Sequence, residues 1–211
     1  MAIDLKNLKP DVRHLDEMKD VAYDKAWLKS APNFELYYMY RKIRVENSLR
    51  YDVTIIPPRM LGQEFVKTKG HVHAGFYGEV YMVLDGEGIY FAQKSSSAKA
   101  SDGQGGDENN IEDVFAVYAK KGDVIVIPAG YGHVTINPSH QVLKTANWVA
   151  ENDKGNFSLF EKNQGACYYY LATADGGAEW MKNEHYKNVP PLRFEKPLKK
   201  VPENLDFLKA K

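Results

Sequence analysis

The chain lacks several features that mark common classes of protein. Its 211 residues contain a single cysteine, Cys167, so no intramolecular disulfide can form. Such sparing use of cysteine is typical of a reducing compartment. No run approaches the roughly 18 apolar residues that a membrane-spanning helix needs, and the polar N-terminus holds no apolar segment of signal-peptide length. We therefore expect a cytoplasmic protein with no membrane partner.

An excess of charge of either sign is also absent. Lysine plus arginine and aspartate plus glutamate number 28 each, so the formal net charge is zero. A protein that binds nucleic acid usually carries a basic excess, and we expect no nucleic-acid partner. Any anionic ligand must then be held by groups local to its site. The length suits one domain covering residues 1–211.

Short segments rich in aromatic and β-branched residues recur along the chain, separated by glycine, proline, asparagine and aspartate. This pattern predicts short strands in an antiparallel sandwich or barrel. The predicted strands are 34–45, 49–58, 79–85, 88–93, 114–119, 123–128, 133–137, 141–149 and 166–172. A turn around Glu46–Ser48 would join the first two. The aromatic stretch FELYYMY, which begins at Phe34, is expected to cover a sheet edge and to contact a second subunit.

The N-terminal part of the chain differs in texture from the predicted core at about 34–175. Residues 1–33 carry helical or irregular signals. Leu15, Met18 and Val21 are spaced as one face of a short helix. We expect this segment to add a short helical element to the core.

Two further segments lack the composition of a core. Residues 94–110 contain no apolar side chain larger than alanine, and such a segment cannot offset its ordering entropy by burial. We expect a mobile loop there. The extension 176–211 is charged and punctuated by proline, and we expect it to wrap over the sandwich or over a partner subunit.

Two histidines lie one residue apart in the stretch TKGHVHAGFYGEVY. Because side chains alternate along a strand, His71 and His73 would point to one face. Glu79 follows a glycine-flanked turn and begins the next predicted strand, so a hairpin can return its carboxylate to the two imidazoles. Sixty residues downstream, GDVIVIPAGYGHVTIN makes a tight bend and then presents His133. The sequence predicts that these four side chains converge.

Three neutral imidazoles and one carboxylate form a borderline-hard ligand set. It suits Fe(II), Mn(II), Zn(II) or Ni(II) and leaves coordination positions for water or substrate. We expect one divalent transition metal ion per subunit and favour Fe(II). The remaining histidines, His14, His140 and His185, stand outside this pattern, and we expect them to be surface or core residues.

The two segments resemble the two motifs of the cupin superfamily. In the first, six residues separate Glu79 from Gly86, as in the family, but five residues rather than three or four separate His73 from Glu79, and Phe65 stands where the motif begins with glycine. The second is matched at each fixed position, by Gly122, Pro128, Gly130, His133 and Asn137. The resemblance implies an all-β fold, the double-stranded β-helix or jelly-roll sandwich of cupins, with a short N-terminal helical segment and a C-terminal extension.

Further segments of the sequence resemble the cupin-type glucose-6-phosphate isomerases known chiefly from archaea. They comprise TKGHVHA at Thr68–Ala74, EVY at Glu79–Tyr81, and VRHLDEMKDVAYDKAW at Val12–Trp27, which lies outside both cupin motifs. The resemblance runs from about residue 12 to residue 175. It implies a metal-dependent isomerase that interconverts glucose 6-phosphate and fructose 6-phosphate, and it implies a homodimer.

The resemblance also implies a set of substrate-binding residues: Thr54, Thr68, Gly70, Tyr81 and Trp148. The two threonines and the backbone of Gly70 would hold the phosphate, while Tyr81 would line the sugar site. Hydroxyls and backbone N–H groups can hold a dianion without net charge, which agrees with the neutral composition. Lys67 and Lys69 flank this segment and are expected to be solvated.

Glu79 is the one acidic residue among these candidates, so we assign it as the catalytic proton carrier between C1 and C2, through a metal-stabilised cis-enediol or enediolate. A direct hydride shift, which needs no base, stays open. Two other functions also stay open: a dioxygenase that uses Fe(II) to activate O₂, and a non-catalytic sugar-binding cupin. Mannose 6-phosphate is a possible additional substrate, because C2 epimers share the enediol.

Overall fold

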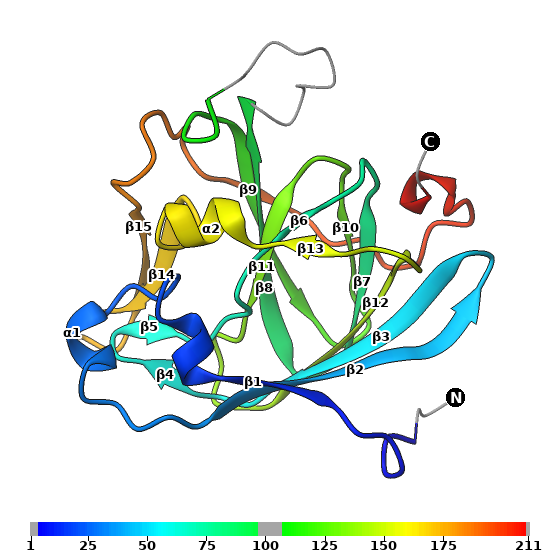
Figure 1. The fold of residues 1–211 in the computed structure, drawn as a ribbon, viewed down its shortest axis with the longest axis horizontal. Helices are drawn as coiled ribbons and strands as arrows, with labels where there is room; N and C mark the ends of the chain where they lie inside the picture. Colours follow the sequence, from blue (N-terminus) through cyan, green and yellow to red (C-terminus); the bar gives the residue numbers. More distant parts are fainter. Residues whose placement is uncertain (1–3, 97–106, 210–211) are drawn as a thin grey trace.

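The structure is a computed structural model that describes residues 4–96 and 107–209. It is built mainly of β-strands, and its six-stranded sheet packs against one of two four-stranded sheets (Figure 1). The six-stranded sheet comprises, in spatial order, β1 (Asp11–His14), β2 (Glu35–Glu46), β3 (Leu49–Ile56), β12 (Leu143–Ala150), β7 (Glu79–Asp85) and β10 (Val124–Ile127). The four-stranded sheet comprises β11 (Gly132–Ile136), β8 (Glu87–Ser95), β9 (Ile111–Lys120) and β16 (Arg193–Glu195).

Smaller elements complete the described fold. A second four-stranded sheet comprises β15 (Ala178–Lys182), β14 (Tyr168–Ala172), β5 (Glu64–Phe65) and β4 (Met60–Leu61), and a two-stranded one comprises β13 (Gly155–Asn156) and β6 (Val72–His73). The helical elements are η1 (Leu15–Met18), α1 (Lys25–Leu28), α2 (Ser158–Lys162) and η3 (Asp206–Leu208). The fold is thus the all-β cupin sandwich that the sequence predicts, and each predicted strand is present.

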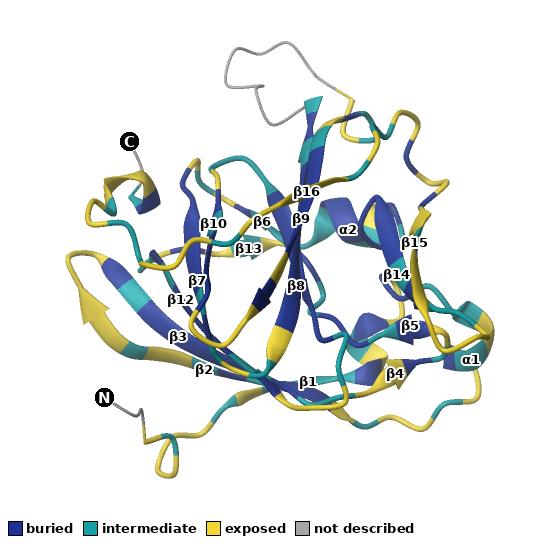
Figure 2. Cartoon of the chain, turned by 180° about the vertical axis from the view of Figure 1, so that it is seen from behind, coloured by how far each residue is buried: buried dark blue, intermediate teal, exposed yellow. Residues whose placement is uncertain are grey.

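Side-chain alternation gives the two main sheets apolar inner faces. Tyr81 of β7 packs against Tyr90 of β8 across the sandwich, with ring centroids 5.2 Å apart. The Tyr90 hydroxyl donates a hydrogen bond of 2.6 Å to Oγ1 of Thr145 on β12, so a buried polar group is satisfied between the sheets. The core surrounds this contact, and Figure 2 shows the buried strands at the centre of the molecule.

The predicted turn at Glu46–Ser48 is confirmed. Asn47 and Ser48 both have positive φ angles, 51° and 63°, as expected for the two-residue hairpin turns that match the twist of the flanking strands. β2 also contains an irregularity between Tyr40 and Arg44, where Lys42 has a φ of 52°. The hairpin therefore bends while keeping both strands in the sheet.

The expected edge position of FELYYMY is wrong. The unpredicted strand β1 pairs antiparallel with this part of β2, from Asp11 opposite Met39 to His14 opposite Glu35, and β3 pairs with its other side. The short helix expected around Leu15, Met18 and Val21 is present in part, as the 3₁₀ helix η1 at Leu15–Met18. It buries Leu15 and Met18 and thereby fixes the N-terminal segment on the core.

The C-terminal extension wraps over its own sandwich. β16 pairs parallel with β9, Leu198 pairs with Val124 of β10, and η3 buries Leu208 completely. Gly78 donates its backbone N–H to the carbonyl of Phe207 at 3.0 Å. The segment around Phe207 therefore lies against the loop that connects β6 to β7.

Two further expectations concern a loop and the absence of membrane-spanning helices. The loop expected at 94–110 lies mostly outside the described residues, which stop at Ser96 and resume at Asp107. Within the described ranges, no helix is long and apolar enough to cross a membrane.

Lys67 is not solvated as expected but buried, with 3% of its surface exposed. Its ammonium group contacts the Glu64 carboxylate and donates to the carbonyl oxygen of Val21 at 2.9 Å. The other Glu64 oxygen accepts the backbone N–H of Tyr23 at 2.9 Å. This pair therefore ties the N-terminal segment to the strands that lead into the histidine region.

Replacing Lys67 with alanine should leave the Glu64 charge buried and unpaired. We expect the free energy of unfolding in urea to fall by about 3–5 kcal/mol. The double variant Glu64→Gln/Lys67→Met should recover much of this loss, because neither remaining group is charged. As a control, Lys121→Met removes an exposed pair with Asp85 and should leave stability unchanged. Equal stability of Lys67→Ala and the native chain would contradict a structural role for the pair.

Candidate metal centre

Backbone pairing brings the first two ligand candidates together. His71 and His133 form an antiparallel bridge, in which His133 donates its N–H to the carbonyl of His71 at 3.0 Å and the reverse bond measures 3.3 Å. Their side chains consequently project from adjacent segments, with ring centroids 4.4 Å apart. Gly70 makes this pairing possible: its φ is +83°, and a Cβ there would lie 2.9 Å from atoms of Phe160 and Val134.

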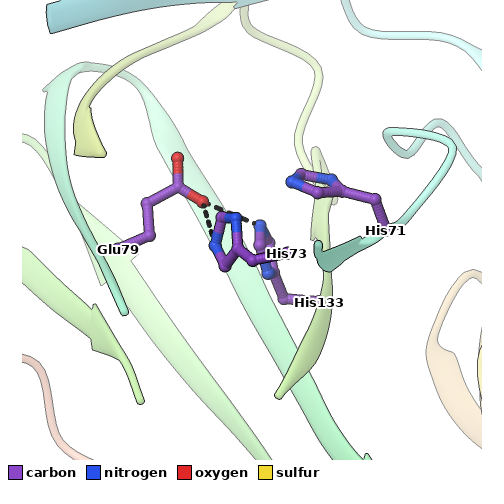
Figure 3. Close-up of side chains that lie close together, drawn as sticks. All are labelled: His71, His73, Glu79 and His133. Atoms are coloured by element: carbon purple, nitrogen blue, oxygen red, sulfur yellow. Dashed lines mark ion pairs between the residues drawn. The ribbon is translucent and has the colours of Figure 1, made fainter. Parts of the chain in front are cut away.

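The other two candidates complete a compact group. His73 lies in β6, and Glu79 begins β7 on the opposing sheet. Glu79 Oε2 is 3.0 Å from His133 Nε2 and 3.4 Å from His73 Nε2. Possible ligand atoms of all four residues lie within 4.8 Å of one another. Figure 3 shows the three imidazoles and the carboxylate gathered around one small space. The predicted convergence is present.

The buried polar atoms of this group fit a divalent ion. His73 Nε2 and Glu79 Oε2 are buried and have no hydrogen bond of acceptable geometry, a state that costs about 1–3 kcal/mol per group when nothing compensates it. Ligand atoms that each lie about 2.1 Å from one ion are roughly 3.0–3.4 Å apart in octahedral or tetrahedral coordination. The two separations measured from Glu79 agree with this range, so these residues could hold a metal ion.

Electrostatics keeps most of the group in a ligand-competent state. Burial raises the pKa of Glu79, but the adjacent His133 and His73 outweigh burial and hold this pKa well below its usual value. Burial, with help from His133, holds the pKa of His71 well below its usual value. Burial also lowers the pKa of His73, but Asp153 and Glu79 raise it to about 9. An ion would therefore displace a proton from His73 at neutral pH.

Two neighbours fix the ligands from the sheet side. Asn147 donates from Nδ2 to Glu79 Oε1 at 2.6 Å, which leaves Oε2 facing the imidazoles. The Tyr81 hydroxyl lies 3.0 Å from His133 Nε2. The sequence analysis identified Tyr81 but missed Asn147. It selected the next residue on the same strand, Trp148, instead.

That residue, Trp148, does not reach the site. Its ring packs against Tyr51 with centroids 4.9 Å apart and lies under the Arg44 guanidinium at 5.6 Å. Because neighbouring side chains on a strand point to opposite faces, Trp148 occupies the outer face of the sheet while Asn147 occupies the inner face. The expected substrate-binding role of Trp148 is therefore corrected.

A cavity opens beside the cluster and contains the other expected residues. Thr54, Thr68, Gly70 and Tyr81 line it together with His71 and Glu79. The Thr68 hydroxyl accepts the N–H of Thr135 at 3.0 Å, so its own proton is available to donate. The Tyr37 hydroxyl, also in the wall, accepts the N–H of Lys69 at 3.0 Å in the same manner.

The cavity wall also carries positive charge that the sequence reasoning missed. Arg13, Arg41, Arg50 and Lys69 all line it. Lys69, expected to be solvated, has a side chain only 13% exposed, with Nζ 2.6 Å from Glu161 Oε1 and 5.4 Å from the Phe157 ring centroid. A bound anion would thus meet cationic groups in addition to the hydroxyls. No local pattern marks Arg13 or Lys69, because they come from separate segments.

The remaining motif residues have structural roles, and the remaining histidines lie elsewhere. Asn137 donates from Nδ2 to the carbonyls of Ile56 and Gln141, each at 2.8 Å, which closes the turn after β11. His14, His140 and His185 take no part in the candidate metal-ligand group found among the described residues. Cys167 is fully buried, and burial raises its pKa well above the usual value.

The sheet order and the mixed histidine–glutamate site define a cupin with a candidate metal centre. The family model of glucose-6-phosphate isomerase (GPI) matches residues 11–189. The chain belongs to the glucose-6-phosphate isomerase family.

Similar proteins agree with this membership. The glucose-6-phosphate isomerase of Thermococcus litoralis is 29% identical over 140 residues, which are 63% of this chain and 65% of that protein. That of Pyrococcus furiosus is 27% identical over 139 residues, 63% of this chain and 66% of that protein. The matched region thus spans slightly less than two thirds of these relatives.

Among solved structures, a predicted oxalate decarboxylase from Thermotoga maritima is similar, with a TM-score of 0.41 and 18% identity over 70% of this chain and 96% of that chain.

Removing one imidazole should abolish tight ion binding. We expect His133→Ala, purified from metal-supplemented cells, to contain far less than one transition metal ion per chain by elemental analysis, because its Nε2 faces the Glu79 carboxylate. His140→Ala is the matched control, since His140 is exposed and takes no part in the group of candidate ligands. Equal metal content in the two variants would contradict the proposed ligand set.

Proposed function

We propose that the protein is a metal-dependent aldose–ketose isomerase that interconverts glucose 6-phosphate and fructose 6-phosphate. The observation that carries this proposal is that two residues of the four-residue cluster, His71 and Glu79, line a cavity that also presents hydroxyl and cationic groups. Such a cavity suits a sugar whose reacting end lies at an ion and whose other end is an anion. Family membership supports the same activity.

The phosphate end would be bound by the side of the cavity that carries Thr54, Thr68 and Gly70. A phosphate dianion accepts several hydrogen bonds, and bonds from cationic donors are about twice as strong as neutral ones. Thr68 can donate its hydroxyl proton, and Lys69 adds an ammonium group from the next residue. Arg13 lies across the Phe157 ring from the same region, at 5.8 Å from the ring centroid. This combination favours a phosphosugar over an apolar substrate of a dioxygenase.

The reaction moves hydrogens between C1, C2 and their oxygens. A divalent ion in the cluster would supply Lewis-acid stabilisation of the negative charge on an enediolate. We assign Glu79 as the proton carrier: its low pKa keeps it in the accepting form, and the Asn147 amide holds its Oε1 in place. Tyr81, which lines the same cavity, would orient the sugar. A proton carrier of this kind typically contributes about 10²–10⁴ in rate.

Fe(II) is the ion we favour among Fe(II), Mn(II), Zn(II) and Ni(II), all of which suit nitrogen and oxygen ligands. A reducing cytoplasm would keep iron in the ferrous state. The single buried cysteine agrees with that compartment.

We also propose that the active assembly is a homodimer. The outer face of the six-stranded sheet carries partly exposed apolar residues, a property that marks interaction surfaces. They are Tyr40, Ile43, Ile55, Met82, Leu84 and Trp148. Trp148 and the Arg44 guanidinium above it provide an aromatic and arginine pair of the kind found at interface centres. This face, rather than the expected strand edge, would meet the second subunit.

The proposal is tested by an assay of fructose 6-phosphate conversion, coupled to oxidation of glucose 6-phosphate. We expect protein stripped with EDTA to be inactive, and we expect anaerobic Fe(II) to restore turnover. The other three ions, added one at a time, rank metal preference, and mannose 6-phosphate tests a second substrate. Full activity after verified removal of metal would contradict a metal-dependent isomerase. Oxygen uptake without isomerisation would indicate a dioxygenase instead.

Glu79→Gln should retain much of the metal yet lose at least about 10²-fold in kcat, because a neutral amide cannot accept the proton. In D₂O the native enzyme should place deuterium at C2 of the glucose 6-phosphate formed from fructose 6-phosphate, detected by NMR. Complete retention of the original hydrogen would indicate a hydride shift and remove the base role of Glu79.

Lys69→Met should weaken substrate binding, because it removes a nearly buried cation from the cavity while keeping the length of the side chain. We expect KM for fructose 6-phosphate to rise roughly tenfold, in line with about 1.5 kcal/mol for one charged hydrogen bond, with a smaller change in kcat. Lys162→Met, which alters an exposed residue on the same helix as Glu161, is the control. An unchanged KM in Lys69→Met would exclude the phosphate contact.

A further inference from the structure

A second buried carboxylate, that of Asp153, lies beside the group of candidate metal ligands. It faces Nδ1 of His73, the ring nitrogen that points away from Glu79. Asp153 Oδ1 is 3.1 Å from His73 Nδ1, while His73 Nε2 is 3.4 Å from Glu79 Oε2. One imidazole is thus placed between two carboxylates, each facing a different ring nitrogen. Asp153 follows β12 by a few residues and belongs to neither of the motifs that mark the cluster.

Other groups hold Asp153 in this position. The Tyr77 hydroxyl donates to the same Oδ1 at 2.8 Å. Arg50 donates to the main-chain carbonyl of Asp153 at 2.9 Å, and its Nη2 lies 3.7 Å from Oδ2. The Asp153 side chain is only 3% exposed, so the carboxylate is fixed on two sides before any ligand binds.

The longer spacer between His73 and Glu79 provides one of these contacts. Tyr77 lies in that spacer, with its ring centroid 5.3 Å from that of His73. Gly75 allows this arrangement, because a Cβ there would lie 2.3 Å from Cε1 of Tyr77. The longer spacer therefore supplies Tyr77, which holds the Asp153 carboxylate next to Nδ1 of His73.

We propose that Asp153, held by Tyr77, is a positioning residue that commits His73 to binding the ion through Nε2. This inference rests on the metal centre of the proposed function. A neutral imidazole carries its proton on one nitrogen, and a carboxylate at Nδ1 selects the tautomer whose Nε2 is free to bind. Nδ1 and Oδ1 are 3.1 Å apart, which is within hydrogen-bonding distance, although no hydrogen bond of acceptable geometry joins them. Such partners typically change metal affinity by about 10–100-fold.

The test is a titration of EDTA-stripped protein with Co²⁺, whose visible absorption reports both affinity and ligand field. We expect Asp153→Asn to bind Co²⁺ about 10–100-fold more weakly than the native chain, with shifted bands, and Tyr77→Phe to show a smaller loss. Asp52→Asn is the matched control, since Asp52 is also buried and accepts a hydrogen bond of 2.9 Å from the same Arg50, while no histidine is among its hydrogen-bond partners within the described residues. It should bind Co²⁺ as the native chain does.

Several outcomes would overturn the inference. Native Co²⁺ affinity in Asp153→Asn, together with a raised KM for fructose 6-phosphate, would make Asp153 a direct substrate contact. Equal weakening in Asp52→Asn would indicate a general effect of losing a buried charge near Arg50. If thermal melting shows that Asp153→Asn is unfolded, native affinity and spectrum in Tyr77→Phe would decide against the role. Failure of the native chain itself to bind Co²⁺ would remove the metal centre, and this result separates loss of the proposed function from loss of the positioning role alone.

Discussion

The backbone bridge between His71 and His133 is the interaction on which the site depends. Two hydrogen bonds, of 3.0 and 3.3 Å, join segments that are far apart in sequence, and they set the direction of two imidazoles at once. The strand β7 then brings Glu79 from the opposite sheet. Because the sandwich fixes the separation of the two sheets, the carboxylate meets the imidazoles without any long side chain having to be ordered.

The surroundings of the cluster divide into two chemically distinct parts. On one side, the buried groups Asn147, Tyr81 and Asp153 contact the ligands and restrict their orientation. On the other side, the cavity wall presents hydroxyls and cations, including Thr68 and Lys69. A low-dielectric setting strengthens both kinds of interaction. The chain has zero net charge, yet four cationic side chains, Arg13, Arg41, Arg50 and Lys69, line one cavity.

Features of the fold that depend on residue spacing along the chain could be predicted from the sequence. The alternating strands, the turn at Glu46–Ser48 and the metal-ligand group all follow from spacing and turn chemistry. Lys67, Lys69 and Trp148 were misjudged because their environment is set by strand partners and by packing, which spacing does not encode. Asp153 was missed because its contacts with His73 and Tyr77 arise only when the segment after β12 folds against the loop before β7. The edge position of β2 failed for a similar reason, since β1 is too short to show an alternating pattern.

The most direct measurement of the central claim is a crystal structure of the metal-loaded protein, with diffraction recorded at the absorption edge of the bound ion. The account predicts one anomalous peak per chain, within about 2.0–2.3 Å of His71, His73, Glu79 and His133 together. A peak elsewhere, or no peak in crystals of protein that retains its metal in solution, would contradict it.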